Sequence, residues 1–152
     1  MKIGVISDTH GLLRPQVGTA LAGVERILHL GDVGDDGILR ELEKIAPVTA
    51  VRGNVDHEGE CARLPETEIL EVQGISIYLL HIIDQLDLDP KAAGFSAVLF
   101  GHSHKAEIRQ HKDVLYFNPG SCGPRRFQLP VTMGFLHVGT DGTLEPKIVE
   151  LG

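Results

Sequence analysis

The first fifty residues of this 152-residue chain alternate between short apolar runs and segments with helical spacing, and this alternation limits the possible folds more than any other feature. Runs rich in β-branched residues predict strands at residues 2–7, 26–30 and 48–51. Proline at the start of residues 15–22, and apolar residues at helical spacing within residues 36–45, predict helices between the strands. Strands and helices in this order favour a parallel sheet with right-handed crossovers.

The second half of the chain predicts a second sheet, because strand patterns there follow one another with few helical segments. A hairpin is expected from residues 68–72 and 75–81, with its turn at Gly74. A short helix is expected to start near Pro90, with Asp89 as its N-cap. Further strands are expected at residues 97–100, 108–110, 114–118, 132–138 and 144–150. The chain is therefore expected to form one α/β domain, residues 1–152, of two packed sheets with helices outside them.

The composition argues against several classes of protein. A net charge of −7 disfavours duplex nucleic acid as the main partner, because that binding needs a basic face. The opening segment MKIGVISDTH has a strand pattern rather than that of a signal peptide, and no apolar run approaches the length of a membrane span. Cys61 and Cys122 lack partners at CxxC spacing, so free thiols are expected. A cytoplasmic location with no membrane contact is the resulting expectation.

Polar side chains gather where the predicted strands end. In open α/β sheets the ligand crevice lies outside the carboxyl ends of the strands, so these side chains are expected on one rim of the molecule. They are Asp8, His10, Asp32, Asn54, His81, His102 and His104.

This set of donors predicts a metal centre. Carboxylate and amide oxygens together with imidazole nitrogens suit Mn, Fe, Zn or Ni better than Ca or Mg alone. The donors exceed the needs of one tetrahedral ion, whereas two ions that share a carboxylate would use them all. Metal pairs ~3.5–4 Å apart are the usual device for in-line attack at phosphorus. Each motif alone is commonplace in turns, and a lone His81 is more often a half-buried histidine, so the prediction rests on their joint occurrence at strand ends.

The motifs resemble those of the calcineurin-like metallophosphoesterases, in the same order and over nearly the whole chain. The signature of that family is D-x-H, G-D-x-x-D, G-N-x-D, a histidine in a later strand, and G-H-x-H. The corresponding segments here are Asp8-Thr9-His10, Gly31-Asp32-Val33-Gly34-Asp35, Gly53-Asn54-Val55-Asp56, His81 and Gly101-His102-Ser103-His104. The short length and residues 118–121 are similar to the small bacterial and archaeal phosphodiesterase branch, which shares its fold with a retromer subunit.

The resemblance implies a four-layer α/β/β/α sandwich of two mixed sheets flanked by helices. It also divides the ligands between two ions, with Asp32 and a water or hydroxide as bridges. The first ion would be held by Asp8, His10 and His104, and the second by Asn54, His81 and His102. By the same resemblance the bridging hydroxide is the nucleophile, and the catalytic candidates are Asp32, Asn54 and Asp56.

Two residues depart from the family pattern. Many relatives have a histidine at the position of Val55 that is thought to protonate the leaving group, and valine cannot donate a proton. The small phosphodiesterase branch often lacks that histidine too, so Val55 supports assignment to this branch. The second departure is Ile82, where relatives often have glycine after the ligand histidine.

Arginine side chains near these motifs are the candidate phosphate-binding groups, because a guanidinium pairs with phosphate oxygens in bidentate fashion. Arg52 and Arg125 are the preferred candidates, followed by Arg126. A solvated surface role is the alternative for each of them.

The predicted function is that of a metal-dependent phosphodiesterase acting on a small phosphate ester. The predicted cofactors are two divalent metal ions, with Mn²⁺ preferred and Ni²⁺, Fe²⁺ or Zn²⁺ as alternatives. Two other functions stay open: a non-catalytic protein-binding scaffold of the same fold, and a phosphomonoesterase or nucleotidase. Oligomeric state cannot be read from the sequence.

Overall fold

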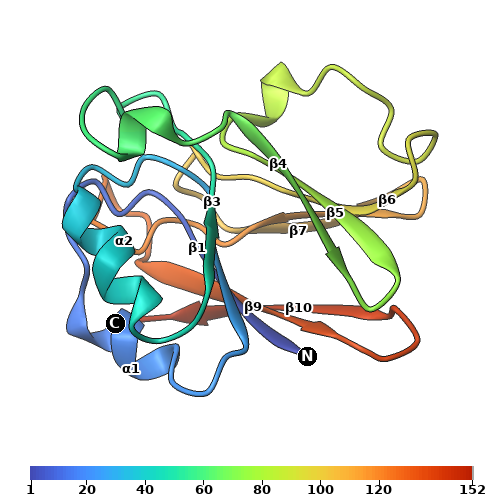
Figure 1. Ribbon diagram of the computed structural model, residues 1–152, viewed down its shortest axis with the longest axis horizontal. Helices are drawn as coiled ribbons and strands as arrows, with labels where there is room; N and C mark the ends of the chain where they lie inside the picture. The colour runs from blue at the N-terminus through green and yellow to red at the C-terminus, as the bar shows by residue number, and fades with distance from the viewer. Residues whose placement is uncertain (152) are drawn as a thin grey trace.

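The computed structural model describes residues 1–151, in which two five-stranded sheets pack face to face (Figure 1). The first sheet has the strand order β10–β9–β1–β2–β3. Its parallel strands are β1 (Lys2–Ile6), β2 (Arg26–His29) and β3 (Val48–Ala50). β9 (Thr132–Val138) runs antiparallel to both β1 and β10 (Leu144–Glu150). The crossovers are α1 (Pro15–Ala20) and α2 (Asp36–Glu43), as the alternation of strands and helices predicts.

The second sheet has the strand order β4–β5–β6–β8–β7. β4 (Thr67–Val72) and β5 (Ile75–Leu80) form the expected hairpin. β6 (Phe95–Leu99) and β8 (Val114–Asn118) continue the sheet in parallel with β5, and β7 (Glu107–His111) is an antiparallel edge strand.

The first sheet is packed on both faces, against the second sheet on one side and against the helices on the other, and an apolar cluster fills each interface. Ile3 and Val5 of β1 belong to the cluster between the two sheets, together with Phe117 of β8, which is among the largest fully buried side chains. Truncating such an aromatic side chain to alanine typically costs about 3–5 kcal/mol. The opposite face of the first sheet packs against both helices through a cluster that includes Val17 of α1 and Leu42 of α2.

The outer face of the second sheet is covered by residues 81–94, which form an irregular layer rather than an α-helix. This segment contains one 3₁₀ turn, η2 (Ile83–Gln85), and packs Leu86 and Leu88 against a cluster that includes Tyr78 and Tyr116. The α/β sandwich of two mixed sheets is confirmed, with this layer in the place where a helical one was expected.

The short helix expected near Pro90 is absent, although its predicted cap is present. The Asp89 side chain accepts a hydrogen bond from Ala92 N at 3.4 Å. The turn then ends at Gly94, whose φ is 88°, and Phe95 begins β6. The segment is too short for a second helical turn before the strand begins.

The bounds of β8, β9 and β10 agree with the prediction. Five other strands end one residue earlier than expected, and a loop of the candidate site follows each of them: β1, β2, β3, β5 and β6. In each of these strands the backbone pairing therefore ends one residue before the strand pattern in the sequence does. α1 and α2 each end two residues earlier than predicted. A search of the described residues finds no helix with the length and hydropathy of a membrane span.

Candidate metal centre

The loops after β1, β2, β3, β5 and β6 meet at one end of the sandwich and bring the seven predicted ligands together. Backbone hydrogen bonds join adjacent loops, such as Asp8 N to Gly31 O at 3.0 Å and Gly101 N to His81 O at 3.0 Å. Six of the ligands form two groups, within which the ligand atoms lie within 4.8 Å of one another. The first group is Asp8, His10 and His104, and the second is Asp32, His81 and His102. The seventh ligand, Asn54, places Oδ1 3.0 Å from His102 Nδ1.

Asp8 presents one free carboxylate oxygen to the first group. Its Oδ2 atom accepts hydrogen bonds from Ser7 Oγ at 2.6 Å and from the backbone N of His102 at 3.1 Å. Its Oδ1 atom is buried without a hydrogen-bond partner, 3.3 Å from His104 Nε2 and 3.5 Å from His10 Nε2. Oδ2 therefore anchors the side chain, and Oδ1 is available to a metal ion.

The ring of His81 is fixed in the orientation and tautomer of a metal ligand. Its Nδ1 atom lies 2.6 Å from the carbonyl oxygen of Leu30, which can only accept, so Nδ1 carries the proton. The lone pair of the neutral ring is then on Nε2, which is buried without a hydrogen-bond partner 3.1 Å from Asp32 Oδ2. A hydrogen bond from the distal nitrogen to a carbonyl is the usual way in which proteins orient a ligating histidine.

The electrostatics of the two groups fit a bound cation. Burial opposes the ionised form of Asp8, but His10 and His104 outweigh it and hold the pKa of Asp8 well below its ordinary value. Asp8 in turn raises the pKa of His10. Burial opposes the charged form of His81, yet Asp32 and Asp8 raise its pKa. Divalent ions would supply the positive charge that these buried carboxylates attract, so the residues present fit a metal centre.

Five of the seven predicted ligands have left-handed backbone conformations, which non-glycine residues seldom adopt. The φ angles are 58° at Asp8, 45° at His10, 56° at Asp32, 71° at His102 and 62° at His104. Each such residue costs roughly 1–2 kcal/mol relative to a right-handed conformation. Aspartate and histidine are among the residues that tolerate this region best, and the concentration of such strain at one rim is typical of a functional site.

Two glycines of the motifs are required by close packing beside the ligands. A Cβ atom at Gly53 would collide with the backbone N and the side chain of Asp32. A Cβ atom at Gly101 would collide with the side chain of Ser7 and crowd Asp8 Oδ2. Both glycines therefore allow one ligand loop to pack directly on another.

His29 was not predicted to belong to the site, but it links the two loops that carry Asp8 and Asp32. Gly31 N donates to His29 Nδ1 at 3.2 Å, so Nε2 carries the proton and donates to Thr9 Oγ1 at 3.0 Å. Thr9 Oγ1 then donates to Val33 O at 2.8 Å. The chain of donors requires a neutral His29, and burial lowers the pKa of this residue to about 4. A histidine before a Gly-Asp motif at a strand end was the available signal.

Asp56 supports the loops rather than facing the ligand cluster. Its two carboxylate oxygens accept hydrogen bonds from the backbone N–H groups of Val33 at 3.3 Å, Gly34 at 3.1 Å and Gly53 at 2.9 Å. These bonds join the loop after β2 to the loop after β3. The arrangement suits a positioning role, and the catalytic role expected of Asp56 stays a prediction.

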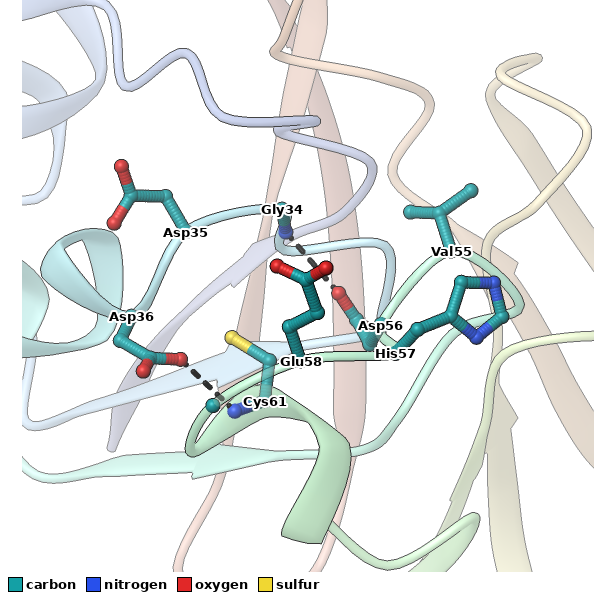
Figure 2. Close-up of a pocket in the computed structure, with 9 residues that line it drawn as sticks. Gly34, Asp35, Asp36, Val55, Asp56, His57, Glu58 and Cys61 are labelled. Carbon is teal, nitrogen blue, oxygen red and sulfur yellow. Dashed lines mark hydrogen bonds between the residues drawn. The ribbon is translucent and has the colours of Figure 1, made fainter.

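A pocket of about 390 Å³ beside the ligand cluster is lined with acidic side chains, and three of them, Asp35, Asp36 and Asp56, have structural partners (Figure 2). Asp35 caps α2 by accepting from Gly37 N at 2.8 Å, and Asp36 accepts from Cys61 N at 3.0 Å. Val55 and His57 lie on the side of the pocket opposite Asp35 and Asp36 in Figure 2. This side of the rim is acidic and unsuited to the anionic part of a phosphate ester.

The arginines differ in how closely they approach the ligands. Arg52 lines a second pocket of about 410 Å³ together with Asn54 and His81, but its guanidinium is held by Glu66 and by Ala62 O. Arg125 is exposed and donates to Leu129 O at 3.4 Å. The third candidate, Arg126, is also exposed, and its charge opposes the rise in the pKa of His10.

Comparisons of sequence and structure agree with this geometry. The sequence matches the Calcineurin-like phosphoesterase superfamily domain over residues 1–141. A probable metallophosphoesterase of Methanocaldococcus jannaschii is 35% identical, over 99% of this chain and 82% of that protein. A phosphodiesterase of the same organism is 31% identical, over 80% of this chain and 84% of that protein.

A similar fold is found in Vps29 of Chaetomium thermophilum, which superposes with a TM-score of 0.78 over 99% of this chain and 95% of that chain. The sequence identity is 18%, so this likeness concerns the fold alone.

Proposed function

The chain belongs to the calcineurin-like phosphoesterase superfamily, and from this premise we propose that it is a metal-dependent phosphodiesterase with a dinuclear metal centre. The observation that carries the proposal is the position of Asp32. Its Oδ2 atom lies 3.1 Å from Nε2 of His81 and 3.5 Å from Nε2 of His10, which belong to different ligand groups. One carboxylate is therefore available to both groups, as a bridging ligand must be.

The seven ligands divide between two divalent ions with Asp32 in common. Asp8, His10 and His104 would hold one ion, and Asn54, His81 and His102 the other. When bound, the ions would supply a hydroxide nucleophile from water at neutral pH and offset the charge that develops on the phosphoryl oxygens. We favour Mn²⁺, with Ni²⁺, Fe²⁺ or Zn²⁺ as alternatives, because the mixed oxygen and nitrogen donors accept all four.

The contribution of the protein is to hold the ligands in place before the substrate arrives. Ser7 and the backbone of His102 fix one oxygen of Asp8, and Leu30 O fixes the ring of His81. Asn54 and His102 are exposed, so this face of the centre is open to a small phosphate ester from solvent. Among the predicted catalytic residues, Asp32 and Asn54 would act in contact with the ions, and Asp56 would position their loops.

The preference for diesters follows from Val55. Its side chain is partly exposed at the rim, and it cannot protonate a departing oxygen. A centre without a dedicated acid favours esters whose leaving group needs no proton. We therefore place the phosphomonoesterase or nucleotidase alternative second.

The scaffold alternative is compatible with the fold that this chain shares with Vps29. Strained backbone at five ligands argues against it, because a surface that only docks a partner has no use for such a cost. Turnover separates the two functions directly.

The test uses metal-stripped protein and two chromogenic substrates, bis(p-nitrophenyl) phosphate and p-nitrophenyl phosphate. We expect no hydrolysis before Mn²⁺ is added, and hydrolysis of the diester in preference to the monoester afterwards. Metal content is measured in parallel, with two ions expected per chain. Full activity of the stripped protein would contradict the proposal. Metal uptake without turnover would favour the scaffold, and preference for the monoester would favour a phosphomonoesterase.

A further inference from the structure

The loop after β8 carries an exposed aromatic side chain on a strained backbone. Phe127 is 88% exposed and has a φ of 53°. It lies in a tight turn that is closed by a hydrogen bond from Leu129 N to Arg126 O at 3.2 Å. We call residues 126–129 the recognition turn.

Neither the exposure nor the conformation of Phe127 serves the fold. A bulky side chain at positive φ is unfavourable, and glycine or asparagine is the usual residue at such a position. Leaving a phenyl ring in water also forgoes the stabilisation that its burial would provide. Strain that packing does not offset points to a role in binding.

The segment that leads into the recognition turn packs on the loop that carries the first ligand group. Ser121 Oγ donates to the carbonyl oxygen of Asp8 at 3.0 Å, and Arg14 Nε donates to Gly123 O at 3.2 Å. The backbone of Gly123 packs so closely on the carbonyl groups of Asp8 and Thr9 that a Cβ atom there would collide with both. In Figure 1 the orange loop after β8 accordingly runs beside the blue loop after β1.

Charge on the rim favours this side for the anionic part of a substrate. Beyond Val55 the rim carries Asp35, Asp36 and Glu58, which repel a phosphate. On the other side, the loop that packs on Asp8 and Thr9 carries two exposed arginines, Arg125 and Arg126. The loop beside the first ligand group therefore offers a guanidinium and, one residue further on, a phenyl ring.

We propose that the recognition turn selects phosphodiesters with a planar aromatic group on the retained side of the ester, stacked on Phe127 while Arg126 binds a phosphate oxygen. The proposal rests on the proposed phosphodiesterase function. The aromatic group can be the base of a nucleotide or a simple aryl ring, because either can stack on an exposed phenyl face.

The test compares three diesters that share p-nitrophenolate as the leaving group. Their retained groups are thymidine 5′-phosphate, phenyl phosphate and ethyl phosphate, and kcat/KM is measured for each with the Mn²⁺-loaded protein. Phe127→Ala is expected to lower kcat/KM on the order of tenfold for aromatic esters and to leave the ethyl ester unchanged. Phe127→Trp should retain the preference, and Ile108→Ala, which removes an exposed apolar side chain from β7, should change none of the three rates.

Differences among the substrates then identify the aromatic group. Loss confined to the thymidine ester indicates a nucleotide, and equal loss for the thymidine and phenyl esters indicates any aryl group. An unchanged ratio of aromatic to ethyl ester in Phe127→Ala would overturn the proposal. Absence of Mn²⁺-dependent hydrolysis of the ethyl ester by the wild-type protein would instead contradict the proposed function.

Binding is therefore also measured without turnover, by calorimetry with thymidine 5′-phosphate and ethyl phosphate on the metal-loaded protein. Weaker binding of thymidine 5′-phosphate alone in Phe127→Ala supports the recognition turn whatever the hydrolysis results. Equal binding of thymidine 5′-phosphate by both proteins overturns it.

Discussion

In its neutral form, His81 directs a lone pair at the carboxylate of Asp32. The ring donates from Nδ1 to Leu30 O, which leaves the unprotonated Nε2 atom 3.1 Å from Asp32 Oδ2. Two electron-rich atoms at this distance repel each other unless a cation lies between them. Without a metal, Asp32 and Asp8 favour a second proton on the ring, so the pKa of His81 is raised despite burial. Metal and proton thus compete for the same position.

This competition predicts that Mn²⁺ stabilises the fold and that the effect weakens as the pH falls. Stabilisation by a ligand at 100 times its dissociation constant is about 2.7 kcal/mol. At pH 8 the melting temperature of the metal-free protein should rise on adding Mn²⁺, and at pH 6 the rise should be smaller, because His10 and His81 have raised pKa values and bind protons instead. Differential scanning calorimetry measures both. An equal rise in His81→Ala would contradict the assignment, and His111→Asn on β7 is the matched control.

Asp32 and Asp35 offer a matched pair of substitutions three residues apart. Asp32→Asn removes the charge shared by both ligand groups and should lower kcat/KM by more than the roughly 10–100-fold typical of outer metal partners. Asp35→Asn should leave activity nearly unchanged, because asparagine caps a helix as well as aspartate and can still accept from Gly37 N. Circular dichroism confirms that both variants fold. Similar losses in the two variants would show that the bridge is misassigned.

Asp56→Asn is expected to lower the free energy of unfolding more than it lowers kcat. The carboxylate accepts three backbone hydrogen bonds, and an amide nitrogen would face one or more of those N–H donors. Loss of a charge-assisted acceptor at a buried position should cost about 1–3 kcal/mol of unfolding free energy. Urea titration measures it. If kcat falls strongly while stability is unchanged, Asp56 has a catalytic role and the positioning role is wrong.

The position of the ligands was predictable because strand ends are visible in the sequence. Apolar runs that stop at Asp8, Asp32, Asn54, His81 and His102 are sufficient to place these side chains on one rim, since the strands of such a sheet deliver their carboxyl ends to a common edge. The strands after residue 113 were predictable for the same reason, with turn residues on both sides of each run.

Other features depend on contacts that no local pattern encodes. The role of His29 depends on a hydrogen bond to Thr9, twenty residues away in the sequence, which its position before the Gly31-Asp32 motif does not specify. The effect of the Arg126 charge on the pKa of His10 depends on how the loop after β8 packs against the loop after β1. The left-handed conformations of His102 and His104 are likewise not specified by the Gly-His-x-His motif itself.

His29 should make the metal-free protein lose stability as the pH falls. Its pKa is about 4 in the folded state against 6.5 in the unfolded state, so only the unfolded chain binds this proton between those values. The difference of about 2.5 units corresponds to ~3 kcal/mol, which is present above pH 6.5 and lost as the pH falls to 4. Urea titrations of wild type and His29→Asn in EDTA, at pH 7.5 and 4.5, isolate this contribution from those of His10 and His81, which have the opposite sign. Equal losses in both proteins would contradict the assignment.

The last prediction concerns the leaving group and Val55. A positioned general acid is typically worth ~10²–10⁴-fold in rate, and valine at this place in the rim cannot supply it. The backbone N of Val55 donates to Asp32 Oδ1 at 2.9 Å, and its side chain is 39% exposed, so a larger polar side chain fits there without being buried. Wild type should therefore prefer aryl diesters strongly over alkyl diesters.

Val55→His should reduce that preference by raising the turnover of alkyl esters by about tenfold or more. The measurement is the slope of log kcat/KM against the pKa of the leaving alcohol, for wild type, Val55→His and Val55→Ala. A steep slope in wild type and in Val55→Ala, and a shallower one in Val55→His, is the expected result. Val55→Ala is the control because it changes the size of the side chain without adding a proton donor. A flat slope in wild type would mean that another group already protonates the leaving oxygen, with His57 on the same side of the adjoining pocket as the first residue to substitute.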